Sequence, residues 1–193
     1  MMAILAATGT YTYFARPRNP VEGFEVKAHW TIKAYHQDGT LYDIRDFDIL
    51  VTNLGRSYMM SCITGLTVTR PNTVIPTAVS CSQTVVIAIG TATASPSRDD
   101  SCLQNEVWRN GLFKSSASQV GTGNSAVVSA TLGARLEATQ GTGAITEAGL
   151  SWTTSTCSVS SPNIITRATF TAVNKSATDV LDLTVTLSYP ASA

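Results

Sequence analysis

Two segments of the chain alternate strictly between apolar and polar residues, one near each end of the sequence. In residues 26–35 every second residue is apolar, and the residues between them are charged or polar. Residues 179–189 repeat the pattern, with Leu181, Leu183 and Val185 on the apolar side. A period of two is typical of a strand with one buried and one solvent-facing side. The chain is therefore expected to build a sheet that covers a hydrophobic core.

Short strands separated by turn residues are expected along most of the remaining chain. Residues 53–65 predict the single helix, with Asn53 as its N-cap and Gly65 at its end. Asp38-Gly39 is a typical hairpin turn, and residues 103–108 fit either a helical turn or an extended segment. Further strands are expected at 41–51, 84–89, 125–137, 145–152 and 164–171. The predicted fold class is all-β, a β-sandwich or jelly-roll-like domain with one short helix.

The first 25 residues predict an extended N-terminal arm, followed by one domain over residues 26–193. Pro17, Pro20 and Gly23 interrupt any regular element there. Aromatic side chains that could make contacts on the arm are Tyr11, Tyr13 and Phe14. We expect the arm to pack on its own domain or to reach a neighbouring subunit.

The charge balance excludes some classes of partner. Thirteen basic residues balance 13 acidic ones, whereas a nucleic-acid binder usually has a basic excess, so no nucleic-acid partner is expected. No apolar stretch approaches the ~18 residues that span a membrane, and residues 1–7 lack the basic start of a signal peptide. Only 13% of residues are charged. A neutral surface rich in Ser and Thr tolerates close packing against neighbours, which favours an assembly subunit.

The four cysteines, Cys62, Cys81, Cys102 and Cys157, have none of the close spacings of a zinc or redox motif. The favoured interpretation is four buried or half-buried thiols. The alternative is one or two disulfides, within or between subunits.

The motifs of common active sites are missing, and no catalytic residue, cofactor or metal is expected. Glu106 and Glu147 could form the carboxylate pair of a glycosidase, but each has a better structural explanation. His29 lies on the polar face of its strand, and no G-x-S-x-G motif occurs. The three tryptophans, Trp30, Trp108 and Trp152, are expected to pack in the core or in an interface.

Several aspartates lie close together in the sequence. Asp43, Asp46 and Asp48, with Asp38 nearby, could hold calcium, although their spacing fits no EF-hand loop. Solvated turn carboxylates are the favoured interpretation, and the same holds for Asp99-Asp100 at an expected loop tip.

Four segments, in order, carry a resemblance to a known group of proteins. They are ILVTNLGRSYMMSCITG (49–65), VVIAIGTATASPSRDDSCLQNEVWR (85–109), ITEAGLSW (145–152) and IITRATFTAVNKSATDVLDLTVTLSY (164–189). Together they resemble structural proteins of tailed-bacteriophage virions.

The resemblance implies a non-enzymatic virion protein that is made in the host cytoplasm. It implies a homo-oligomer, a trimer or larger ring, with other virion proteins as partners. Two placements stay open: the tail, neck or fibre-attachment region, and the outer capsid as a decoration protein. The alternative function is a carbohydrate- or receptor-binding module of a phage tail. That module would use exposed aromatics, with Tyr11, Tyr13, Trp108 and Trp152 as candidates.

Four charged residues stand in apolar strand context and are candidates for structural or interface pairing: Glu106, Arg109, Glu147 and Arg167. A carboxylate and a guanidinium can form two parallel hydrogen bonds, which fixes their geometry. We expect one of the two glutamates to pair with one of the two arginines, across strands or across subunits. The alternative is four independent solvated charges.

Overall fold

The computed structural model describes residues 26–64, 85–110, 114–120, 127–158 and 162–189. The predicted arm of residues 1–25 lies outside them. The elements, in chain order, are β1 (Lys27–Tyr35), β2 (Leu41–Val51), α1 (Asn53–Thr64), β3 (Val86–Gly90), β4 (Glu106–Asn110), β5 (Lys114–Val120), β6 (Val127–Leu136), β7 (Gly143–Ser151), β8 (Ile164–Lys175) and β9 (Val180–Tyr189). This confirms the prediction of an all-β fold with one short helix, for the part of the chain described.

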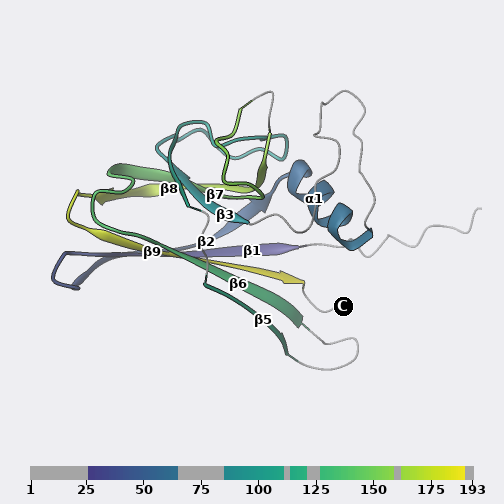
Figure 1. Ribbon diagram of the computed structural model, residues 1–193, viewed down its shortest axis with the longest axis horizontal. Coiled ribbons are helices and arrows are strands. Elements are labelled where there is room, and N and C mark those ends of the chain that lie inside the picture. Colours follow the sequence, from purple (N-terminus) through teal and green to yellow (C-terminus); the bar gives the residue numbers. More distant parts are fainter. Residues whose placement is uncertain (1–25, 65–84, 111–113, 121–126, 159–161, 190–193) are drawn as a thin grey trace, which may run out of the picture.

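All nine strands belong to one antiparallel sheet, in the order β4-β3-β7-β8-β2-β1-β9-β6-β5. The sheet curls at β2, which pairs with β1 over most of its length and with β8 only at Leu50 and Val51. Its two halves therefore face each other, with β3, β7 and β8 over β1, β9 and β6 (Figure 1).

The chain passes directly from one end of this sheet order to the other between β4 and β5. β4 and β5 are the outermost strands, yet only three residues separate Asn110 from Lys114. Four chain steps span at most about 14 Å. The end of β4 and the beginning of β5 are therefore close in space, although their strands lie at opposite ends of the hydrogen-bonding order.

The core fills the space between the two halves and follows the alternation expected from the sequence. On β1 the buried residues are Ala28, Trp30, Ile32 and Ala34. They stand opposite Leu187, Val185, Leu183 and Leu181 on β9. Ile87, Leu150 and Ile165 come from the other half and pack into the same cluster. Each fully buried Val, Leu or Ile in this cluster contributes roughly 1.5–3 kcal/mol of hydrophobic stabilisation.

Helix α1 begins at the predicted residue, but its N-cap differs from the prediction. Its N-cap is Thr52, whose Oγ1 accepts a hydrogen bond from the Gly55 N–H at 2.9 Å. Asn53 was the wrong choice, because it is the first residue of the helix, and its side-chain amide donates to Asp99 at 2.9 Å. A Cβ on Gly55 would lie 2.1 Å from the carbonyl oxygen of Ile165. A glycine is needed here because the helix backbone touches β8 directly.

Two strands differ from the expectations. β5 was not predicted, because its sequence KSSASQV offers almost no apolar residue to alternate. Residues 103–108, for which two conformations were left open, pass into the extended strand β4.

Candidate functional site

The loop between β3 and β4, residues 91–105, lies over the outer face of β3, β7 and β8, and we call it the covering loop. Two ionisable residues are completely buried beneath it, Glu147 of β7 and Arg167 of β8. The sheet register places Arg167 opposite Gly149, two residues from Glu147 on the same face of β7. The strands thus bring the two charges together beneath the covering loop.

Arg167 binds both the sheet and the covering loop. Its Nε donates to Oε1 of Glu147 at 2.5 Å, and one terminal nitrogen donates to Oδ2 of Asp100 at 2.7 Å. The carbonyl oxygens of Ala94 and Ser95 accept its remaining hydrogen bonds, at 3.0 and 3.3 Å. Burial alone would lower the pKa of the Arg167 guanidinium, but hydrogen bonds to Asp100 and Glu147 outweigh it and raise that pKa. We call Arg167, Glu147 and Asp100 the Arg167 cluster.

Glu147 also holds the far end of the covering loop. Its carboxylate accepts the backbone N–H groups of Gln104 at 2.9 Å and Asn105 at 3.3 Å. A Cβ on Gly90 would lie 2.5 Å from both Glu147 Oε2 and the Asn105 carbonyl oxygen. A glycine at position 90 is therefore required for the loop to close down on the carboxylate.

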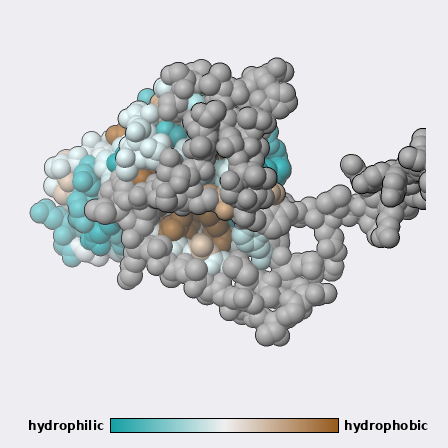
Figure 2. All heavy atoms as spheres, turned by 45° about the vertical axis from the view of Figure 1, so that its right-hand side comes forward, coloured by the Kyte–Doolittle hydropathy of each residue, from teal (hydrophilic) through white to brown (hydrophobic). Residues whose placement is uncertain are grey.

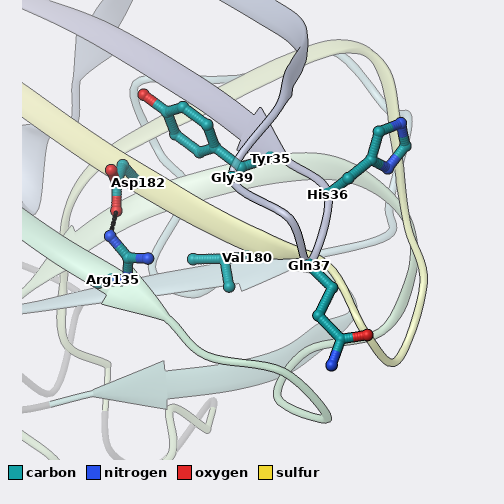
Figure 3. A pocket seen from close by; sticks show the side chains of 7 residues that line it. All are labelled: Tyr35, His36, Gln37, Gly39, Arg135, Val180 and Asp182. Atoms are coloured by element: carbon teal, nitrogen blue, oxygen red, sulfur yellow. Dashed lines mark ion pairs between the residues drawn. The ribbon is translucent and has the colours of Figure 1, made fainter.

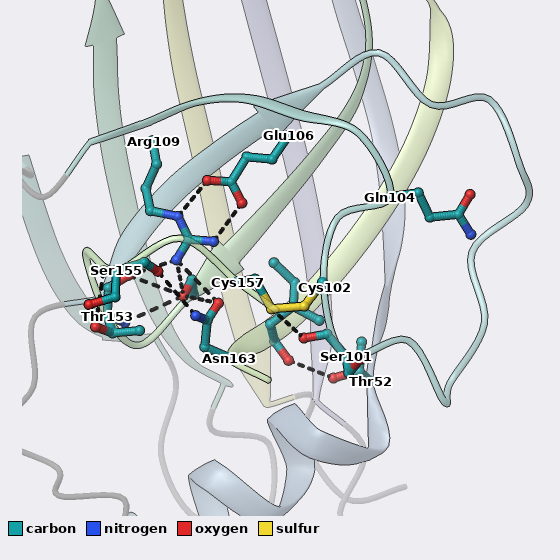
Figure 4. The surroundings of a disulfide bond; sticks show 12 residues. Thr52, Ser101, Cys102, Gln104, Glu106, Arg109, Thr153, Ser155, Cys157 and Asn163 are labelled. Atoms are coloured by element: carbon teal, nitrogen blue, oxygen red, sulfur yellow. Dashed lines mark hydrogen bonds and ion pairs between the residues drawn. A yellow bond between two sulfur atoms is a disulfide. The ribbon is translucent and has the colours of Figure 1, made fainter. Parts of the chain in front are cut away.

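A second group of polar residues joins β4 to the segment between β7 and β8 (Figure 4). Arg109 donates two parallel hydrogen bonds to Glu106, at 2.7 and 2.6 Å. Its other terminal nitrogen reaches Ser151, the Thr153 carbonyl oxygen and Asn163, at 2.8, 2.8 and 3.1 Å. The Arg109 and Glu106 side chains are only 5% and 11% exposed. This geometry fixes the edge strand β4 against β7.

A disulfide between Cys102 and Cys157 ties the covering loop to the same β7–β8 segment (Figure 4). The favoured expectation of free thiols is therefore wrong for these two residues. It failed because their approach depends on how the covering loop folds back, which spacing in the sequence does not reveal. Cys62 is disulfide-bonded too, and Cys81 lies outside the described residues.

The structure thus brings the four charged candidates together in two pairs. Glu106 and Arg109 lie on one strand, and Glu147 and Arg167 lie on neighbouring strands. Both pairs form within one chain. The sequence did not single out Asp100 for this cluster, because a carboxylate at a loop tip is usually solvated. The arm residues Tyr11, Tyr13 and Phe14 lie outside the described residues.

A shallow hollow of about 360 Å³ lies next to the β1–β2 turn (Figure 3). Tyr35 of β1, Asp182 of β9 and Arg135 of β6 line it. Arg135 pairs there with Asp182 at 3.4 Å and also with Glu137 at 3.2 Å. The charges of the hollow are thus largely balanced.

Beside this hollow, Asp179 connects the β8–β9 turn to the β1–β2 hairpin. It accepts the backbone N–H of Ser176 at 2.8 Å and the Tyr42 hydroxyl at 3.3 Å, and His36 lies 3.3 Å away. The Ser176 N–H is the largest cause that holds the pKa of Asp179 at about 2. Burial first, and then the nearby Asp179 carboxylate, raise the pKa of Tyr42 to about 12.

Of the aspartates considered for calcium, Asp43, Asp46 and Asp48 lie on strand β2, and Asp38 lies in the β1–β2 turn. Asp48 is 2.9 Å from the His29 ring and Asp46 accepts the Thr31 hydroxyl at 2.6 Å, while Asp43 pairs with Arg45. Within the described residues, no group of three or more His, Cys, Asp or Glu side chains is arranged to hold a metal.

Trp152, a candidate for sugar binding, is not available at the surface. It is 4% exposed, and its ring stacks on Tyr58 with centroids 5.2 Å apart. Trp30 is completely buried, and Trp108 packs against the core. On the face drawn in Figure 2, hydrophobic colour gathers in one small area among hydrophilic and neutral residues.

Comparison with known proteins found no matching family, no matching curated protein and no matching solved structure. In the part of the chain that the structure describes, no helix has the length and apolar character that crossing a membrane requires.

Proposed function

We propose that this chain is a non-enzymatic structural subunit of a tailed-phage virion, which works by packing against copies of itself and other virion proteins. The observation that carries the proposal is where the four resembling segments lie. They supply the end of β2, α1, β3, the covering loop, β4, β7, β8 and β9. The strands among them other than β9 are hydrogen-bonded neighbours in one half of the sheet. Motifs that are scattered in the sequence thus lie mostly in one connected unit.

Within that unit the conspicuous charges have a mechanical role. Arg167, Glu147 and Arg109 each bind several partners and hold a loop or an edge strand in place. Residues 93–95 and 97–99 of the covering loop remain exposed above these anchors. A loop fixed from below presents a preformed surface, which lowers the entropy cost of binding a neighbour. This supports a role in packing.

The test is co-sedimentation of the purified protein with two kinds of particle, tail-free capsids and capsid-free tails. Binding to capsids at many copies supports a decoration protein that stabilises the shell. Binding to tails or necks at few copies supports a connector or fibre adaptor. Binding to neither kind of particle would overturn the proposal. A covering-loop variant, Arg98→Glu, changes one exposed residue and should weaken binding if the loop is the contact.

A further inference from the structure

Among the described residues, strand β5 has a partner strand on one edge only. It pairs with β6 over all seven residues from Lys114 to Val120, and it is the last strand in the sheet order, so no described strand lies on its other side. The outward-facing N–H and C=O groups of such an edge can pair with an added strand. Its length of seven residues is enough to take one.

The beginning of β1 lies level with this edge. Lys27 stands opposite Ser188, Ser188 opposite Ser129, and Ser129 opposite Ser118. Strands are about 4.8 Å apart, so four spacings place an added strand beyond β5 about 19 Å from β1. The point at which the chain enters β1 is therefore about 19 Å from a strand added beyond β5.

The preceding segment has the composition of a strand followed by a stiff spacer. Residues 10–14, TYTYF, are five consecutive residues of high β-propensity. With Thr8 and Gly9 they make seven residues, the length of β5. Pro17 and Pro20 follow, and proline fixes φ and favours an extended chain. The 12 residues from 15 to 26 can extend to roughly 40 Å.

We infer that residues 8–14 of one subunit add as an antiparallel strand to the free edge of β5 in a neighbouring subunit. This inference rests on the proposed function, for which it supplies the contact between copies. It makes the N-terminal arm the partner of β5.

Addition to a neighbour is favoured over addition to the same chain. All neighbours in the sheet order alternate in direction, so β5 runs antiparallel to β1. If residues 8–14 added antiparallel to the chain's own β5, they would end at the end of β5 that lies farther from the start of β1. The spacer would then have to run back along β5 as well as across four strands. Two prolines keep the spacer extended and oppose this reversal. Addition to β5 of a neighbouring subunit requires no such reversal of the spacer.

The experiment compares the full-length chain with the variant Tyr11→Pro/Thr12→Pro. Two adjacent prolines remove a hydrogen-bond donor whichever side of the added strand faces β5. The control, Arg16→Pro/Asn19→Pro, places two prolines in the spacer. Sedimentation gives the oligomeric state, and hydrogen exchange followed by mass spectrometry gives the protection of residues 114–120. The test variant should dissociate and lose protection there by about tenfold or more, while the control keeps both.

Dilution separates the two possible sources of the added strand. Protection from a neighbour must fall together with the oligomer as the chain is diluted. Protection that persists in the monomer would assign the strand to the same chain and overturn the inference. An oligomer of unchanged size and β5 protection in the Tyr11→Pro/Thr12→Pro variant would also overturn it, because β5 would then pair with something other than the arm. Neither result bears on binding to virion particles.

Discussion

At the scale of single residues, Arg167 is the group with the largest structural consequence. It is fully buried, and its hydrogen bonds go to two carboxylates and two carbonyl oxygens. Removing a guanidinium from water costs several kcal/mol, which the attraction of its partners offsets only when the geometry is good. The net stabilisation from such a cluster is small, but the loss of one member is costly. The cluster therefore specifies where the covering loop lies more than it stabilises the fold.

Substituting Arg167 with Met should destabilise the fold by about 3–5 kcal/mol, because Glu147 is left buried without its counter-charge. The free energy of unfolding from urea titration measures this. The control is Arg98→Met on the exposed part of the covering loop. This substitution should change the free energy of unfolding by no more than about 0.5 kcal/mol. In the double variant Arg167→Met/Glu147→Gln the buried charge is gone, and part of the loss should be recovered. Equal effects of Arg167→Met and Arg98→Met would contradict a buried cluster.

The sequence predicted some of these residues and not others, for physical reasons. Glu147 and Arg167 could be selected because a charge inside an apolar strand needs a partner. Their pairing with Asp100 could not, because it depends on the path of a loop with few apolar residues. The same holds for Cys102 and Cys157, which are 55 residues apart in the chain.

At the scale of elements, the periodic strands were the most predictable. β1 and β9 each place one face on the core, so burial and sequence share the same period. β7 is buried from Ile145 to Ser151 on both faces, because the covering loop lies on its outer side. β5 is an edge strand of mostly small polar residues, and its position comes from pairing with β6 and not from its own composition.

The covering loop is the element for which the disulfide matters most. Cys102 and Cys157 close a segment of 55 residues, and in the chain-entropy account the loss of such a link costs about 4 kcal/mol. We expect Cys102→Ala/Cys157→Ala to lower the free energy of unfolding by up to that amount. Hydrogen exchange should accelerate first in residues 91–105, while β1 and β9 change less.

The matched control for this variant is the wild-type protein under the same conditions. No reductant is added to either sample, so that the disulfide of the wild type stays intact. Uniform acceleration over the whole sheet would mean that the covering loop is not a separately opening unit. A change of less than about 0.5 kcal/mol would mean that the hydrogen bonds of the loop hold it without the disulfide.

At the scale of the whole molecule, the chain crosses between the two halves of the sheet at few points. The turn from β8 to β9 is one of them, since β8 belongs to one half and β9 to the other. Asp179 lies in this turn and binds Tyr42 of β2. His36, in the turn between β1 and β2, is within 3.3 Å of it. One carboxylate thus joins the β8–β9 turn to the β1–β2 hairpin.

This arrangement makes Asp179 a determinant of stability in acid. Its pKa is held at about 2, below the ordinary 3.8, so its carboxylate stabilises the fold above pH 3.8. That contribution is lost as the pH falls from 3.8 towards 2. The wild type should therefore lose more stability over this interval than Asp179→Asn, which has no carboxylate there to protonate. Thermal unfolding at several pH values measures the difference.

Asp48→Asn, at a side chain 93% exposed, controls for the general effect of removing one negative charge. If the wild type and Asp179→Asn lost stability in parallel from pH 3.8 to 2, the Asp179 carboxylate would not be what joins the β8–β9 turn to the β1–β2 hairpin.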